Sequence, residues 1–421
     1  MKVYEVFHKN KILMGDFHHD ETARIYNFKK FKHLWLKKDN EKWYFKTRLP
    51  NKELYIGDVV APYIFERVGL KQEDYLMYYL VEMETPEGVK AGVLSKNYIG
   101  KHEFQLSYYD IALFCYCLDN GIEYDDIKDE RVMGNGSSPL KDFERTFREN
   151  PGEYMISLED MLYNIQRFCD HCNFQVDLDD IAFKLKRELL TDFFLCQVDR
   201  HQENTEFKIK HGKLTMCPIF DHEKCLAIGL LGTMYNLEKF PIYTGFSAVG
   251  ARENTYEDEA KKIAKFNIPN AQKFAQDLMN NADFIHKSRL FKNDGLMAVD
   301  IIAECLKDER LAALASNFLA LDIHKTLDDF EKEYMQISQF VKTCMCDQFE
   351  VMQEKFYRTF RGVEKHFKNK NNASFQKLQA KFKQPLLEIE EKIKKREDAL
   401  YAHKHKTSEL DEEFLLGLLQ G

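Results

Sequence analysis

The first hundred residues alternate short apolar segments with polar ones, as β-strands do. Four segments fit strands, at residues 34–37, 43–47, 76–83 and 89–94. Between the second and the third, residues 58–68 carry apolar side chains at helical spacing and predict a helix. We therefore expect residues 1–100 to form a strand-rich upper lobe.

From residue 107 onward, apolar positions recur every three or four residues, which is the period of an amphipathic helix. Helices are predicted over residues 108–118 and 158–168. A further helix should follow Asp177, a residue type that caps helix N-termini. Its buried face would carry Leu178, Ile181, Leu185, Leu189 and Phe193. Residues 101–325 are therefore expected to form a mostly helical lower lobe.

One part of this lower lobe has the pattern of a β-hairpin. Residues 206–210 alternate polar and apolar side chains, His211-Gly212 supplies a two-residue turn, and residues 213–217 run back. Because strands rise about 3.3 Å per residue, arms of similar length return residues 218–221 to the neighbourhood of Asn204. We expect Asn204 and Asp221 to face one site.

The last hundred residues are rich in charge, with apolar positions three and four residues apart. Helices are predicted over residues 330–367 and 375–401, with Ser374 as the N-cap of the second and a kink at Pro385. A narrow apolar stripe needs a partner. It either packs on the lower lobe or forms a coiled coil, a dimer contact or a partner-binding arm. Residues 326–421 are treated as a helical C-terminal extension.

Composition narrows the class of protein. The chain has 421 residues with 44% hydrophobic side chains, enough for two lobes and an extension. A net charge of −8 shows no extended basic surface for nucleic acid. Charges interrupt the N-terminal segment, which excludes a signal peptide, and no apolar run approaches the ~18 residues of a membrane helix. We expect a cytoplasmic protein without a membrane partner; secretion of the finished protein as an effector is compatible with this.

Three further segments have compositions that can indicate a site. The ten cysteines are scattered through apolar segments and indicate reduced core residues, and the lone CxxC at residues 169–172 favours a structural turn over a metal or redox site. His18-His19-Asp20-Glu21 favours a charged loop over a metal site. Residues 133–140, MGNGSSPL, favour a flexible connector, with a phosphosite or lid as the alternative.

The most specific chemistry lies around the hairpin. Residues 199–204 read DRHQEN, and Asp221 follows seventeen residues after Asn204. Magnesium prefers oxygen ligands, which the amide of Asn204 and the carboxylate of Asp221 provide. Asp199 is placed to accept the proton of an attacking hydroxyl, which contributes roughly 10²–10⁴-fold to a rate. His201 would contact phosphate or brace the loop. The spacing is typical of a kinase site, the alternative being ordinary polar loop residues.

With these motifs in place, residues 178–226 resemble the HipA-like kinases, and specifically the CtkA-type serine/threonine kinases. In these a DRHxxN loop, a hairpin and a PIFD segment occur in the same order. The resemblance implies a bilobal α+β fold of the protein-kinase-like type. It extends upstream to WYFK, where Lys46 would bind the α- and β-phosphates of ATP, and to residues 56–70, where Asp58 would pair with that lysine.

The resemblance also places the adenine-binding strand. Residues 92–98, GVLSKNY, resemble the strand that leads to the hinge, where backbone groups near Ser95, Lys96 and Asn97 would meet adenine. Two features depart from the family pattern. Residues 1–45 contain a single glycine, Gly15, and no serine, so neither a glycine-rich phosphate loop nor its regulatory serine is identified. His222-Glu223 follows Asp221 where relatives have a small residue.

The resemblance implies an ATP- and Mg²⁺-dependent kinase that phosphorylates a protein Ser/Thr hydroxyl, as a toxin of a toxin–antitoxin pair or as an effector. An antitoxin or another partner would then use the C-terminal helices. Two alternatives stay open. The DRHxxN loop also looks like that of phosphoinositide kinases, which implies a lipid or small-molecule substrate. The missing glycine-rich loop favours a nucleotide-binding scaffold without catalysis.

Overall fold

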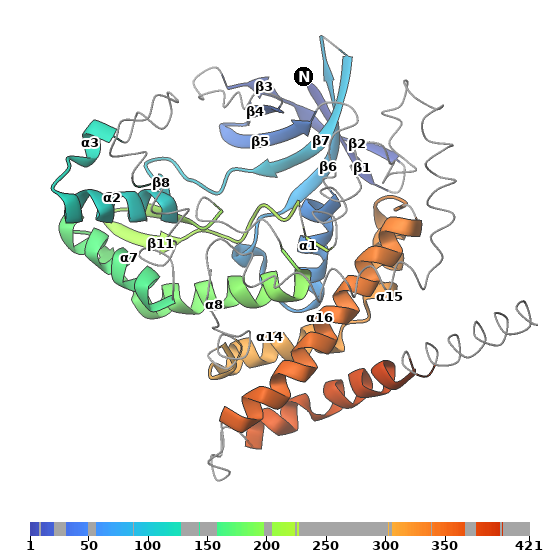
Figure 1. The fold of residues 1–421 in the computed structure, drawn as a ribbon. Coiled ribbons are helices and arrows are strands. Elements are labelled where there is room, and N and C mark those ends of the chain that lie inside the picture. Colours follow the sequence, from blue (N-terminus) through green and yellow to red (C-terminus); the bar gives the residue numbers. More distant parts are fainter. Residues whose placement is uncertain are drawn as a thin grey trace, which may run out of the picture.

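The structure is a computed structural model that describes residues 1–7, 10–20, 31–48, 56–86, 88–127, 143, 158–197, 204–223, 225–226, 302, 305–337, 339–366, 376–395 and 398. The fold is mixed α+β, with antiparallel strand pairing and several helices (Figure 1). The strands are β1 (Lys2–Phe7), β2 (Asn10–Asp16), β3 (His18–His19), β4 (Phe31–Lys38), β5 (Glu41–Arg48), β6 (Tyr78–Thr85), β7 (Gly88–Lys96), β8 (Phe104–Ser107), β9 (Gln175–Val176), β10 (Glu206–Lys210) and β11 (Lys213–Met216). The helices are α1 (Ile56–Arg67), η1 (Gln72–Asp74), α2 (Tyr108–Asn120), α3 (Tyr124–Ile127), α7 (Leu158–Cys172), α8 (Leu178–Leu195), α14 (Glu309–Ala320), α15 (Ile323–Glu333) and α16 (Gln339–His366).

The larger sheet contains the four predicted strands. Among the described residues it has seven strands in the order β2-β1-β6-β7-β5-β4-β3, and every neighbouring pair is antiparallel. One face is buried in a cluster that includes Leu36, Phe45, Val81 and Leu94. The strands β1, β2 and β3 were not predicted. Strand β2 is an edge strand with mostly exposed side chains, so its sequence lacks the alternation that reveals a half-buried strand.

The smaller sheet contains the predicted hairpin. Within the described part of the chain its order is β8-β10-β11-β9, and β10 pairs antiparallel with β11. His211 and Gly212 have φ angles of 50° and 74°, as expected for a two-residue turn whose twist matches the strands. Phe207 and Leu214 turn to the core beneath this sheet, against α2, α7 and α8. The hairpin prediction is confirmed.

Helix α8 also begins where the sequence predicts. The Asp177 carboxylate accepts a hydrogen bond from the N–H of Asp180 at 3.0 Å, which satisfies a donor of the first turn. Ile181, Leu185 and Phe193 are buried, and the helix ends at Cys196 in a left-handed conformation. The rigid helix therefore ends just before the DRHQEN loop, as expected.

Two shorter segments complete the comparison with the sequence. The CxxC segment forms the last turn of α7, which therefore extends past the predicted end at residue 168, and Cys169 is buried on the apolar face of that helix. The charged loop predicted at His18 and His19 was wrong, since these residues form β3. Asp20 after them is buried and binds Lys37 at 2.6 Å and Lys42 at 3.6 Å, so the charge that suggested a loop is neutralised inside the fold. Residues 133–140 lie outside the described residues.

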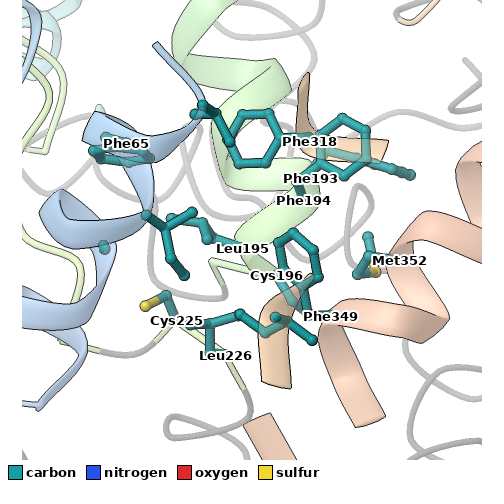
Figure 2. Packing of buried hydrophobic residues seen from close by; sticks show 14 of the residues in the cluster. Phe65, Phe193, Phe194, Leu195, Cys196, Cys225, Leu226, Phe318, Phe349 and Met352 are labelled. Atoms are coloured by element: carbon teal, nitrogen blue, oxygen red, sulfur yellow. The ribbon is translucent and has the colours of Figure 1, made fainter. Parts of the chain in front are cut away.

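One hydrophobic core joins α1 to the helices after residue 305. Figure 2 shows Phe65 of α1, Phe193 and Phe194 of α8, Phe318 of α14 and residues of α16 facing a common interior. The ring of Phe194 stacks on Phe318 at 4.7 Å and on Phe356 at 5.2 Å between centroids. Cys225 and Leu226, from the segment after the hairpin, complete this interior. The segment that carries Asp221 is therefore anchored in the core.

The C-terminal helices belong to the same core. The single helix predicted over residues 330–367 is instead two, α15 and α16, which pack on each other and are bridged by Lys342 of α16 and Asp328 of α15. A further helix, residues 376–395, continues through Pro385. The ring centroid of its Phe382 lies 5.8 Å from that of Phe356 and 5.1 Å from that of Phe360. The prediction that the apolar stripe of the C-terminal helices packs on the helical part of the protein is thus confirmed. Across the described residues, no helix combines the length and the apolar character needed to cross a membrane.

Truncating Phe382 tests this packing. Its side chain is fully buried, so Phe382→Ala should lower the free energy of unfolding by about 3–5 kcal/mol in a urea titration. Leu387 lies on the same helix but is 45% exposed, and Leu387→Ala should cost less than about 1 kcal/mol. Equal effects of the two substitutions would show that the 376–395 helix is not packed as described.

Candidate active site

The ammonium group of Lys46 is the centre of the candidate site. Lys46 is 6% exposed, and its Nζ lies 3.2 Å from Asp58 Oδ2, 2.8 Å from Asp221 Oδ1 and 2.6 Å from Glu223 Oε2. These partners come from α1 and from the segment that follows the β10–β11 hairpin. The ion pair of Lys46 with Asp58, expected from the family resemblance, is present.

The local strand pattern positions Lys46. Side chains alternate along β5, so Phe45 enters the core of the larger sheet while Lys46 projects from the opposite face. Strand β5 lies between β4 and β7, with Lys46 opposite His33 on one side and Val93 on the other. An inner strand of a sheet is a rigid support, which fixes the origin of the long lysine side chain.

Asp58 lies in the first turn of α1 and uses both carboxylate oxygens. Its Oδ2 accepts from Lys46, and its Oδ1 accepts from the backbone N–H of His222 at 2.8 Å. Pro62 lies past the first turn, inside the helix. Because proline has no N–H, it cannot donate the helical hydrogen bond to the carbonyl of Asp58. Through its two hydrogen bonds, Asp58 connects both Lys46 and the segment of Asp221 to α1.

Gly57 allows α1 to lie directly against that segment. A Cβ atom at residue 57 would stand 2.3 Å from the carbonyl oxygen of His222 and 3.0 Å from the carbonyl carbon of Glu223. Both are backbone atoms, which cannot rotate away as a side chain would. The absence of a side chain at Gly57 is thus a condition for the close approach of Asp58 to its partners.

Asp221 adopts an uncommon backbone conformation that several groups hold in place. Its φ of 59° is left-handed, which is uncommon for a residue with a side chain and recurs at functional sites. Gln197 Nε2, just after α8, donates to the carbonyl of Asp221 at 2.6 Å. The buried phenol oxygen of Tyr78 on β6 accepts from the backbone of Asp221. The carboxylate of Asp221 is therefore aimed at Lys46 by contacts from both sheet and helix.

Negative charge exceeds positive charge among the four described side chains of this cluster. Lys46, Asp58, Asp221 and Glu223 together carry a formal charge of −2, since one ammonium faces three carboxylates. Burial raises the pKa of Asp58 to about 7, and the Lys46 charge opposes that rise. Burial alone would lower the pKa of Lys46, but Asp221, Asp58 and Glu223 outweigh it and raise that pKa well above its ordinary value.

The three carboxylates of this cluster are also suitable ligands for a metal ion. One oxygen from each of Asp58, Asp221 and Glu223 lies within 4.8 Å of the others. Hard carboxylate oxygens are the donors that magnesium accepts, and a divalent cation would offset the formal charge. The donor set of this site therefore fits Mg²⁺. Binding of the ion by Asp221 stays a prediction.

The other predicted metal ligand, Asn204, lies at the base of the hairpin. Asn204 is 6% exposed, and the hydroxyl of the next residue, Thr205, donates to Glu188 Oε2 of α8 at 3.0 Å. The N–H of Cys217 donates to the carbonyl of Glu206 at 2.8 Å and closes the two arms. The hairpin thus returns the chain as predicted; binding of one ion by Asn204 and Asp221 stays a prediction. Asp199 and His201 lie outside the described residues.

Of the three predicted adenine-binding residues, Ser95 and Lys96 end strand β7 and Asn97 follows it. Ser95 is buried, opposite Tyr44 of β5 and Tyr78 of β6. The ammonium group of Lys96 instead pairs with Glu41 near the surface. The N–H of Asn97 donates to the carbonyl of Lys42 at 2.9 Å, and its side-chain oxygen accepts from the N–H of Ile99 at 3.1 Å. Contact of these backbone groups with adenine stays a prediction.

Beyond Asn97, three polar side chains meet. Tyr98 Oη and Gln105 Nε2 both donate to Oε2 of Glu206, the first residue of β10. The ring of Tyr98 lies 6.1 Å from that of Phe220, the residue before Asp221. Burial raises the pKa of Glu206 to about 7, and the hydrogen bonds from Tyr98 and Gln105 oppose that rise. This group connects the end of β7 to the hairpin.

Glu103 holds the same stretch of chain from the other end. Its carboxylate accepts from the N–H of Gly100 at 2.7 Å and lies 3.4 Å from Lys208 Nζ and 3.0 Å from Lys210 Nζ of β10. The Gly100 hydrogen bond first, and then these two lysines, lower the pKa of Glu103 to about 2. The turn after Tyr98 is therefore tied to β10 by charge.

Sequence reasoning missed Glu223 and the Tyr98, Gln105 and Glu206 group. Glu223 was noticed only as a departure from the family pattern, although its spacing of two residues from Asp221 allows both carboxylates to reach one cation. For Glu206 the signal was a charged residue at the start of a strand whose other face is buried. Neither signal is specific without the fold.

Comparison with known proteins finds similarity among solved structures. No family model and no curated protein matches the chain. Among solved structures, the chain is similar to one described as "Crystal structure of A Helicobacter pylori proinflammatory kinase CtkA", with 14% sequence identity. The similarity covers 81% of this chain and 93% of that chain, with a TM-score of 0.44. At this level the function of the chain has to be argued from its own residues.

Substitution of Gly57 tests the contact of α1 with the Asp221 segment. Alanine usually stabilises a helix by about 0.5–1 kcal/mol relative to glycine. Here the added Cβ would collide with the His222 carbonyl, so Gly57→Ala should lower the free energy of unfolding by about 1–3 kcal/mol. Chemical denaturation measures the change. A stabilised variant would mean that α1 does not pack against residues 222–223.

Substitution of Glu103 gives a pH-dependent test. A pKa lowered to about 2 from an ordinary 4.5 means that the Glu103 carboxylate stabilises the fold above pH 4.5, and that this contribution is lost as the pH falls through about 2. The difference in unfolding free energy between wild type and Glu103→Gln should be full near about pH 6 and shrink over that window. A difference that stays constant with pH would contradict the ion pairs of Glu103.

Proposed function

We propose that this protein is an ATP-dependent kinase with a bilobal, protein-kinase-like fold. The observation that carries the proposal is the position of Lys46 Nζ, 3.2 Å from Asp58 of α1 and 2.8 Å from Asp221 beyond the hairpin. Phosphoryl transfer needs positioned positive charge on phosphate oxygens more than it needs covalent help. A buried lysine aimed by two carboxylates, beside a donor set that fits magnesium, supplies such a site.

Each residue of the candidate site has a distinct role in this proposal. A bound cation would pair with some of the carboxylates that contact Lys46. The Lys46 ammonium group would then bind phosphate oxygens of ATP. Asn204 and Asp221 would hold Mg²⁺, and Glu223 lies close enough to Asp221 to join them. The ion, when bound, neutralises charge on the phosphate oxygens. Asp199 would accept the proton of the attacking hydroxyl, and His201 would contact phosphate or brace the loop. Ser95, Lys96 and Asn97 would border the adenine through their backbone.

The acceptor that we propose is a Ser/Thr hydroxyl of a protein. This choice rests on the order of the DRHQEN loop, hairpin and PIFD segment in the sequence, which resembles the HipA-like kinases of CtkA type. A role as a toxin or effector in the cytoplasm, with an antitoxin or other partner on the C-terminal helices, follows the same resemblance. The exposed remainder of the 376–395 helix, including Leu387, is the surface that such a partner would reach.

Nucleotide binding tests the role of Lys46. Lys46→Met should weaken binding of ATP with Mg²⁺ by about tenfold or more, because charge-assisted hydrogen bonds to phosphate are lost. Lys71→Met is the matched control. Lys71 lies just before η1 with an exposed side chain, so this variant should bind ATP as wild type does. Isothermal titration calorimetry measures both. If Lys46→Met does not fold, Lys46→Arg is measured in its place, because arginine retains the positive charge. Unchanged affinity in folded Lys46 variants would count against the proposed site.

Phosphate transfer tests Asp199 and the acceptor class. With labelled ATP and Mg²⁺, wild type should phosphorylate itself or a protein in a lysate, and mass spectrometry would identify the Ser or Thr. Asp199→Asn should reduce the rate by at least ~10²-fold, whereas Asp170→Asn, at an exposed position on α7, should not. Labelling of lipids but not of proteins would favour the lipid-kinase alternative. Binding of ATP without any transfer would favour the scaffold.

A further inference from the structure

The side chains around Glu206 have an arrangement that packing alone does not require. In the β8–β10 ladder Glu206 stands opposite Ser107, and Lys208 stands opposite Gln105. Residues two apart on a strand share a face, so Glu206 and Gln105 lie on one side while Phe207 and Leu106 enter the core on the other. Glu206 therefore projects from the sheet face opposite the core, toward Tyr98.

The two donors of this group meet the same carboxylate oxygen. Tyr98 Oη and Gln105 Nε2 both donate to Oε2 of Glu206, and Gln105 Nε2 also lies 3.2 Å from Tyr98 Oη. Within the part of the chain that the structure describes, Oε1 of Glu206 accepts no side-chain or backbone hydrogen bond. One oxygen is thus fixed by the protein, and the other is left as an oriented acceptor.

A carboxylate at this place carries an electrostatic cost. Glu206 is partly buried, and Asp221 and Asp110 add negative charge to its surroundings. A neutral glutamine could accept the same hydrogen bond from Tyr98 without that cost. The cost is offset where a ligand donates to the second oxygen.

Glu206 also stands at a suitable place for the nucleoside part of a nucleotide. Lys46 is opposite Val93, and Trp43 is opposite Lys96, so the end of β7 lies three strand positions, about 10 Å, from Lys46. Tyr98 follows that end by two residues and contacts Phe220, the neighbour of Asp221. A nucleotide with its phosphates at Lys46 and Asp221 would extend its sugar and base toward Tyr98 and Glu206.

On this geometry we propose that Glu206 is a specificity-determining residue of the nucleotide site, whose Oε1 accepts a hydrogen bond from an N–H or O–H donor of the nucleoside. Tyr98 and Gln105 are positioning residues that fix the carboxylate through Oε2. This inference rests on the proposed nucleotide site. The donor is either the exocyclic amine of adenine or a ribose hydroxyl, which share this chemistry.

Four nucleotides distinguish the two donors. ITP replaces the adenine amine by a carbonyl, and 2′-deoxy-ATP and 3′-deoxy-ATP each lack one ribose hydroxyl. With Mg²⁺ and the full-length chain, calorimetry should show wild-type protein binding ATP about tenfold or more tightly than one of these analogues. Weaker binding of ITP would identify the adenine amine as the donor. Weaker binding of a deoxynucleotide would identify the ribose hydroxyl that it lacks.

Variants of Glu206 and Tyr98 separate recognition from bracing. In Glu206→Gln the amide oxygen can accept from Tyr98 and Gln105, which leaves an NH₂ group, a donor, in place of Oε1. The gap between ATP and the weak analogue should then fall to less than about threefold, a coupling that a purely structural residue would not show. Tyr98→Phe removes one positioning hydrogen bond but retains Oε1, and should keep the ranking of the four nucleotides.

The possible failures are distinguishable. If wild type binds nucleotides and Glu206→Gln binds all four as wild type does, or weakens all four equally, Glu206 only braces the chain and the inference is overturned while the kinase proposal stands. If wild type binds none of the four in the presence of Mg²⁺, the proposed nucleotide site itself is wrong.

Discussion

A single buried ammonium group determines how the parts of this protein meet. Lys46 Nζ contacts carboxylates from α1 and from the segment after the hairpin, so strand β5, helix α1 and residues 221–223 have to arrive at one point. Burying charges costs free energy unless each is paired, and removal of one member would leave the others uncompensated. The site is therefore assembled under a strict electrostatic condition, with Gly57 supplying the space and Asp58 the link between helix and strand.

The features that the sequence revealed are those that short-range patterns encode. The β10–β11 hairpin follows from alternation around His211-Gly212, and α8 follows from Asp177 and its apolar positions. The approach of Lys46 to Asp58 came from resemblance to a family, because no spacing rule connects a strand residue to a helix twelve positions later. The mixed α+β class and the Lys46–Asp58 ion pair were thus accessible before the structure, whereas the roles of Asp199 and His201 stay predictions from the sequence.

The features that the sequence did not reveal depend on contacts between distant segments. Glu223 is an ordinary charged residue until β5 brings Lys46 within 2.6 Å of it. Glu206 lies more than a hundred residues after Tyr98 and Gln105, and the pairing of β8 with β10 brings it to them. Strand β2 lies at a sheet edge with few buried side chains, so tertiary pairing rather than its own pattern determines its conformation. The break between α15 and α16 similarly reflects how these helices fold back on each other.

Gln353 shows how late in the chain the interior is completed. Its Nε2, on α16, lies 2.9 Å, 3.1 Å and 3.1 Å from the carbonyl oxygens of Phe318, Leu319 and Leu321, at the end of α14 where carbonyls lack a partner from a following helical turn. Phe356 and Phe382, later still, cover the stacked rings of the core. During synthesis, a ribosome-bound chain that already contains Lys46, Asp58 and Asp221 would still expose this aromatic surface to the surrounding medium. Folding of the core beside Lys46, Asp58 and Asp221 is consequently coupled to release of α16 and of the 376–395 helix from the ribosome.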